Sequence, residues 1–225
     1  VLPVTYNEYW YFTALSGLYV LKPLLDIALR KFISKVSTDG NFNSTATTKT
    51  YNRAPEVDSS KLKDGTSTDA TYTKASSKLS VNKGDLVTYK IRVYNEGDLA
   101  GYADQVADYI PEGLAFLTTY KANVDNNWHL PDDAKPVKLS ELGVTTSNLK
   151  VTDFEGLSDL EAIEVVKGNG KTKIYSTLLE ASESKNLIKA FDKENGTTLD
   201  YKDIEVTCIV IADEITNNNG RNKRL

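Results

Sequence analysis

The stretch "GDLVTYKIRVYNEGD", residues 84–98, has the clearest periodicity in the chain. Its side chains alternate between apolar and polar, the apolar set being Val87, Tyr89, Ile91 and Val93 and the polar set Thr88, Lys90 and Arg92. Alternation of period two over this length is typical of a half-buried antiparallel strand. We therefore expect the apolar set to be buried and the polar set to be exposed.

Further strand and turn signals follow this segment. The stretch "GYADQVADYIPEGLAFL", residues 101–117, predicts a strand, a turn and a second short strand. Pro111 fits the turn because its ring presets the backbone angle that the turn needs. Downstream, "DIEVTCIVIADEIT", residues 203–216, predicts another apolar strand, and Cys208 within it is expected to be a small core residue.

Two shorter signals lie between these strands. "KGNGK", residues 167–171, indicates a hairpin turn, and "ESKNLIKAF", residues 183–191, predicts a short helix with Ser184 as its N-cap. Together, the short and evenly spaced strands predict an all-β fold. We expect an immunoglobulin-like β-sandwich with long loop insertions and one or two short helices.

The composition limits the class of protein. The 225 residues carry a net charge of -4, so the chain has no basic surface of the kind that binds nucleic acid. A single cysteine excludes an internal disulfide. Abundant Thr, Ser, Asn and Tyr suit a β-rich extracellular protein. The one histidine, His129, has no metal-binding spacing or nucleophile motif near it, so we expect no metal, no cofactor and no catalytic residues.

The first residues differ from the rest. The run "YWYFTALSGLYVL", residues 9–21, is the most apolar in the chain, but it is short for a membrane span and no basic region precedes it. "LPVTY" before it is similar to a sortase signal, except that Tyr6 stands where that signal has Gly. We expect residues 1–22 to lie outside the sandwich core, with packing on that core left open, and residues 23–225 to form the domain. We expect no direct membrane insertion.

Lys31 raises a question of its own. In "LLDIALRKFI", residues 24–33, it shares the apolar face of a predicted strand with Leu29 and Ile33. Burying an unpaired ammonium group costs several kcal/mol or forces the group to become neutral. Either Lys31 points inward toward a buried acid, or its stem packs while its charge reaches solvent.

Residues 24–216 resemble the bacterial conserved-repeat surface domain, the family first catalogued as domain of unknown function eleven. The family motif is Gly-Asp-x-Val-x-Tyr-x-Ile-x-Val-x-Asn-x-Gly, followed by a strand ending in Asp and then Leu-Pro-x-Gly-Leu. Ile110 stands where the family has Leu. The residues that match are Gly84, Asp85, Val87, Tyr89, Ile91, Val93, Asn95, Gly97, Asp108, Pro111, Gly113 and Leu114.

This resemblance implies an immunoglobulin-like sandwich, usually in tandem on Gram-positive cell surfaces. The family is similar to pilin and collagen-adhesin domains, many of which contain an internal Lys–Asn isopeptide bond. By that resemblance Lys31 is the crosslinking amine, Asp108 the assisting acid and Asp85 the alternative acid. Asn217 is the nearest candidate for the partner amide, although the chain is expected to stop before the last strand.

The function expected from these features is that of a non-enzymatic stalk or spacer, extracellular and attached to the cell surface or cell wall. Its partners would be neighbouring domains of the same protein. The alternative is an adhesin domain that binds a glycan or a host protein through its insertions. For that alternative the candidate binding residues are three aromatic side chains expected to be exposed, Trp128, Tyr120 and Tyr102, because aromatic faces stack on sugars and anchor interfaces.

Overall fold

The computed structural model describes residues 24–38, 48–77, 79–145, 147–148 and 160–213. The fold is all-β and sandwich-like, with a few short helices, as the sequence predicts. The strands are β1 (Ile27–Ser37), β2 (Thr48–Thr50), β3 (Glu56–Asp58), β4 (Thr71–Thr73), β5 (Leu86–Asn95), β6 (Val106–Tyr109), β7 (Leu114–Leu117), β8 (Trp128–His129), β9 (Val137–Lys138), β10 (Glu164–Lys167), β11 (Lys173–Ser176) and β12 (Tyr201–Val210). The helices are α1 (Ser60–Lys63) and α2 (Lys121–Asp125), with 3-10 turns η1 (Leu139–Leu142), η2 (Leu160–Ala162) and η3 (Ser184–Asn186).

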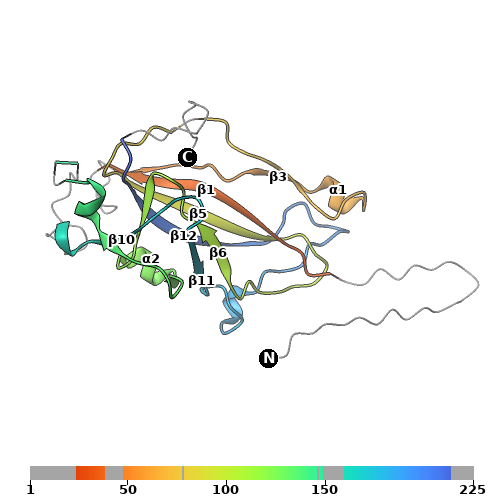
Figure 1. The fold of residues 1–225 in the computed structure, drawn as a ribbon. Helices are drawn as coiled ribbons and strands as arrows, with labels where there is room; N and C mark the ends of the chain where they lie inside the picture. The colour runs from red at the N-terminus through yellow and green to blue at the C-terminus, as the bar shows by residue number, and fades with distance from the viewer. Residues whose placement is uncertain (1–23, 39–47, 78, 146, 149–159, 214–225) are drawn as a thin grey trace, which may run out of the picture.

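The main sheet has the strand order β2-β1-β5-β12-β7-β10-β9. Its three long strands, β1, β5 and β12, lie side by side at the centre (Figure 1). β5 pairs antiparallel with both neighbours, from Ile27 opposite Asn95 to Ser37 opposite Leu86 on one side. On the other side the register runs from Tyr201 opposite Tyr94 to Ile209 opposite Leu86. β1 and β12 therefore run in the same direction on either side of β5.

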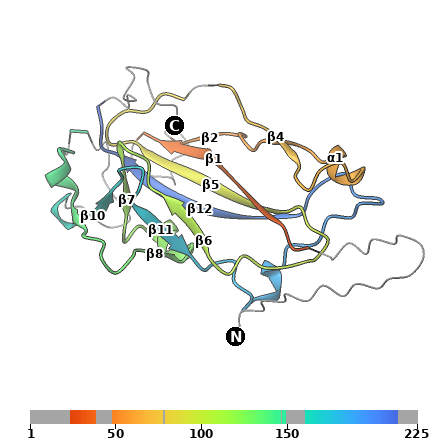
Figure 2. The ribbon, with the colours of Figure 1, turned by 45° about the vertical axis from the view of Figure 1, so that its right-hand side comes forward.

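A second sheet, of order β6-β11-β8, packs against one face of the main sheet (Figure 2). We call the covered face the inner face and the opposite one the outer face. The largest apolar cluster fills the space between the sheets. The inner face of β5 contributes the set that the alternation predicts to be buried, Val87, Tyr89, Ile91 and Val93, and this prediction is confirmed. Cys208 of β12 is buried in the same cluster, also as predicted.

The prediction that the polar set is exposed is wrong. Thr88 is fully buried, and Lys90 and Arg92 are half-buried. The reason is that the outer face is also covered at both ends. One end lies under an apolar cluster that contains Leu86 and Tyr120, and the other lies under a cluster that contains Tyr94 and Phe191.

Two turns carry the chain from one sheet to the other. The turn predicted at Pro111 is present, and Gly113 in it has a φ of 87°, which favours glycine. It joins β6 in the second sheet to β7 in the main sheet. The turn after β10 leads back to β11 in the second sheet, so the hairpin predicted at residues 167–171 is wrong. Gly168 lies against the Pro111 carbonyl, where a Cβ would clash, so the two crossings are packed together.

The helix predicted at residues 183–191 is also wrong. Only the 3-10 turn η3 forms, and its N-cap residue is Glu183 rather than Ser184. The chain then extends, because the backbone of Ile188 exchanges two hydrogen bonds with Gly101 at 2.8 and 3.0 Å. Burial of Ile188 in the core thus overrides the local helical pattern. None of the helices in the described residues is long and apolar enough to cross a membrane.

Candidate functional site

Lys31 and Asp108 form an ion pair that joins the two sheets. Lys31 lies on β1 of the main sheet and Asp108 on β6 of the second sheet, and Nζ lies 2.6 Å from Oδ2. The Lys31 amine also donates to the Tyr109 carbonyl oxygen at 3.5 Å. The side chains are 25% and 12% exposed, respectively. The lysine is therefore neither deeply buried nor free in solvent, and the acid that it meets is the first candidate named from the sequence.

The surroundings of this pair are apolar but include two titratable groups. Lys31 Nζ lies 4.3 Å from the ring centre of Tyr89. The Tyr89 hydroxyl is buried and has no hydrogen-bond partner within the described ranges. Burial raises the pKa of Tyr89, and it raises the pKa of the Cys208 thiol to about 12. Both groups are neutral at physiological pH, so Asp108 is the charged partner that Lys31 meets here.

The other crosslink candidates lie elsewhere. Asp85 precedes β5 and accepts a hydrogen bond from the Asn82 amide at 2.8 Å. Lys31 of β1 lies opposite Ile91 of β5, and Ile91 is six residues after Asp85. At roughly 3.3 Å per residue, that separation is about 20 Å. The structure thus brings Asp108, and not Asp85, to the lysine, while Asn217 lies outside the described residues.

The aromatic side chains proposed for an adhesin site are not exposed. Trp128 is buried, and its indole nitrogen donates to the Glu205 carbonyl oxygen at 2.7 Å. Tyr120 is buried in an apolar cluster against the outer face. Tyr102 is half-buried. The expectation of three exposed aromatic residues is therefore wrong. These residues lie in turn-rich segments, which have no periodicity from which burial could be predicted.

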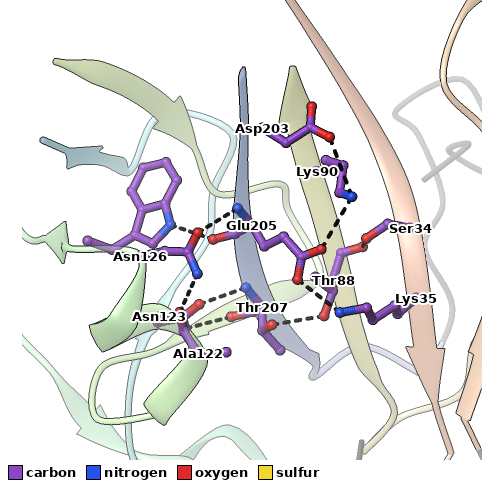
Figure 3. A network of polar contacts seen from close by, with 11 residues as sticks. Ser34, Lys35, Thr88, Lys90, Ala122, Asn123, Asn126, Asp203, Glu205 and Thr207 are labelled. Carbon is purple, nitrogen blue, oxygen red and sulfur yellow. Dashed lines mark hydrogen bonds and ion pairs between the residues drawn. The ribbon is translucent and has the colours of Figure 1, made fainter. Parts of the chain in front are cut away.

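A side-chain cap covers part of one edge of β12 (Figure 3). β12 pairs with β7 only from Cys208 to Val210. Before that, the Asn123 side chain accepts from the Thr207 amide at 2.7 Å and donates to the Thr207 carbonyl at 2.9 Å. Asn126 accepts from the Glu205 amide at 2.9 Å. With Trp128, these side chains satisfy backbone groups that a neighbouring strand would otherwise pair.

An ion-pair network crosses the outer face beside this cap (Figure 3). Glu205 accepts from Lys35 at 2.9 Å and lies 3.6 Å from Lys90. Arg92 donates to both carboxylate oxygens of Asp203, at 2.8 and 2.9 Å. Opposite charges at alternate positions of residues 84–98 and 203–216 are the signal in the sequence that could have identified this pairing.

A cluster of three acids lies at the end of the main sheet where β1 begins. Carboxylate oxygens of Asp26, Asp69 and Glu96 lie within 4.8 Å of one another. Glu96 Oε1 accepts from the Ala70 amide at 2.9 Å and from the Tyr72 hydroxyl at 2.7 Å. Oxygen ligands of this kind suit hard cations, but acidic groups also cluster without one, and the geometry alone assigns no metal.

No family model, curated protein or solved structure matches this chain. The resemblance to the conserved-repeat surface domain therefore stays a prediction.

Proposed function

We propose that this chain is a structural stalk or spacer module of a Gram-positive cell-surface protein, which carries tension and projects neighbouring domains. The observation that carries the proposal is the direction of the central strands. β1 enters the main sheet at Ile27, opposite Asn95. β12 ends beyond Ile209, which lies opposite Leu86. The chain thus enters and leaves the central ladder at opposite ends of β5.

This geometry determines how the sheet responds to tension. A force applied between the start of β1 and the end of β12 runs along the strands. It loads the hydrogen bonds that β5 makes with both neighbours in shear, so that many bonds have to break together. Peeling a strand from its end would instead break them one at a time. A module with this strand arrangement is suited to resist stretching along its length.

The ion pair between Lys31 and Asp108 supports the same function, because it fastens the second sheet to the strand at which tension enters. The family resemblance adds a covalent version. The Lys31 amine would attack the side-chain carbonyl of an asparagine, an amide would form, ammonia would leave, and Asp108 would relay the proton. Asn217 lies outside the described residues, so the crosslink stays a prediction. An intact mass lower by one ammonia would support it.

The alternative function, a glycan-binding or protein-binding adhesin domain, has lost its main support. Two of its three aromatic candidates, Trp128 and Tyr120, are buried. An enzyme is not proposed.

Single-molecule stretching tests the stalk function. Handles attached through Leu24→Cys and Asp213→Cys pull the strands in shear, because both positions are exposed and lie toward opposite ends of β5. Handles at Leu24→Cys and Tyr201→Cys instead pull from the same end of the sheet. The native Cys208 does not compete for the handles, since it is buried and its thiol pKa is raised to about 12.

We expect the unfolding force to be several times higher in the first geometry than in the second. The matched pair shares one handle and the same sheet, so only the direction of loading differs. Equal and low forces in both geometries would argue against a tension-bearing role.

A further inference from the structure

The end of the main sheet where β1 begins exposes a group of leucines, which we call the pole patch: Leu24, Leu25 and Leu99. They are 54%, 40% and 46% exposed, respectively. Large apolar side chains exposed together make this end of the sheet a candidate surface for another group to cover.

The pole patch is held in place by its backbone. The Leu24 carbonyl accepts hydrogen bonds from the amides of Asp98 and Leu99, at 2.8 and 3.3 Å. Leu25 packs against Gly101, where a Cβ would lie 2.6 Å from a methyl carbon of the leucine. Gly97 likewise has no room for a Cβ beside the Leu24 carbonyl. Two glycines thus let the two chain segments approach closely and present the leucines from a fixed base.

Negative charge borders the pole patch. Asp26 follows Leu25 in the chain, and its carbonyl accepts from the Glu96 amide at 2.8 Å. The carboxylates of Asp26, Asp69 and Glu96 gather here, and none of them forms an ion pair with another described residue. Glu96 is buried and accepts hydrogen bonds from Ala70 and Tyr72, so the negative charge at the surface comes from Asp26 and Asp69.

We propose that the pole patch is covered by the apolar segment of this same chain, residues 9–21. This segment is joined to Leu24 by only two residues, so its effective concentration at the patch is high. Its tyrosine, tryptophan, phenylalanine and leucine side chains match the apolar surface. Lys22 follows the segment and is opposite in charge to Asp26 and Asp69. The proposal does not depend on the stalk function.

Trp10 within this segment provides the test. Fluorescence of the full chain minus that of a Trp10→Phe variant isolates Trp10 from Trp128. We expect Trp10 to be protected from acrylamide quenching, and Leu99→Asp to abolish that protection. Val124→Asp is the matched control, because Val124 is 58% exposed on α2, outside the pole patch. It should leave the protection unchanged.

Leu24→Asp repeats the test from the neighbouring position, and circular dichroism confirms that each variant is folded. Loss of protection in both pole variants but not in the control supports the proposal. Three results would overturn it: a Trp10 fully open to acrylamide in the unsubstituted chain, equal behaviour of Leu99→Asp and Val124→Asp, or protection that disappears on dilution. The last result would assign the patch to a second copy of the chain.

Discussion

The inner and outer faces of the central strands differ in chemistry, although β1, β5 and β12 supply both. On the inner face, Tyr89 and Ile91 pack against the second sheet. On the outer face, Lys90 and Arg92 lie opposite Glu205 and Asp203 of β12. Burial of apolar area holds the inner face and has no direction, whereas ion pairs hold the middle of the outer face and require specific neighbours. Strict alternation therefore sorts side chains into two faces, but it does not say which of them meets water.

The two faces also contribute differently to stability. Exposed and half-exposed ion pairs contribute about 0–1 kcal/mol each, so most of the free energy of folding comes from apolar burial on the inner face and at the two covered ends of the outer face. The outer face contributes specificity instead. A slip of β12 by one residue would place Ile204 opposite Lys90 and would turn every buried side chain to the other face. The charges thus favour one register.

The largest effect is expected on the inner face of β12. Ile204→Ala removes a fully buried side chain and should lower the free energy of unfolding by about 3 kcal/mol, since the cavity adds to the lost burial. Urea unfolding measures this. The neighbouring Glu205→Ala on the outer face is the control and should cost less than about 1 kcal/mol. Equal losses would show that the two faces contribute alike.

The next effect tests the cap on β12. Asn123→Ala leaves the amide and carbonyl of Thr207 without partners and should cost about 2 kcal/mol. Hydrogen exchange at the Thr207 amide should accelerate in proportion. Asn126→Ala is the milder control, because the Asn126 side chain makes one contact with the backbone of β12, at the Glu205 amide, beside its bond to the Ala122 carbonyl. An unchanged exchange rate at Thr207 would show that water or another group replaces the cap.

Alkaline pH gives a third test, again on the inner face. Burial raises the Cys208 thiol pKa from 9.0 to about 12, so its neutral form is favoured in the folded state. A raised folded pKa adds stability that is complete below pH 9 and is lost as the pH rises toward 12. Relative to a Cys208→Val variant, the parent chain should lose about 1.4 kcal/mol between pH 7 and pH 10. Parallel stability curves for the two proteins would contradict this.

Two tyrosine hydroxyls give a fourth test, because their removal is expected to change the free energy of unfolding in opposite directions. Tyr89→Phe removes an inner-face hydroxyl that has no partner in the described residues, and should stabilise the fold by about 1 kcal/mol. Tyr72→Phe makes the same chemical change where the hydroxyl donates to Glu96 at 2.7 Å, and should destabilise it by a similar amount. Thermal unfolding of both variants decides the point. Destabilisation by Tyr89→Phe would reveal a bound water on that hydroxyl.

The smallest effect is expected at the pair between the sheets. Lys31→Met should change the free energy of unfolding of this chain by less than about 1 kcal/mol, because a partly buried ion pair is often no better than an apolar replacement. Calorimetry measures the change. In a longer polypeptide that forms the predicted crosslink, the same substitution should lower the melting temperature clearly. Equal effects in the two proteins would argue against the crosslink.

The sequence predicts local features of this fold better than distant ones. Alternation identifies the inner face of β5, and Pro111 identifies a turn, because both depend on neighbouring residues. That β6 and β7 belong to different sheets is not visible in the sequence, since a turn signal does not say which strands it separates. The short helix expected at residues 183–191 does not form, because the backbone of Ile188 pairs with that of Gly101, which is distant in the chain.

The candidate site was predictable to the same extent. Lys31 and Asp108 each lie on the same face of their strand as apolar neighbours, and this local signal is visible in the sequence. The structure brings the two side chains together. The cap by Asn123 and Trp128 could not be foreseen. It depends on where β7 stops pairing with β12, and no repeat in the sequence marks that position.

The position of β5 between β1 and β12 has a consequence for folding during synthesis. Thr88 meets Ser34, 54 residues earlier in the chain, but its other partner, Thr207, is 119 residues later. During synthesis one edge of β5 therefore waits unpaired until nearly the whole domain has been made. Such an edge can capture other chains, and pairings this distant form slowly. Lys90 and Arg92 lie beside that edge, and their positive charge repels the same strand of another chain. The charges that favour one register in the folded protein therefore also oppose aggregation of the growing chain.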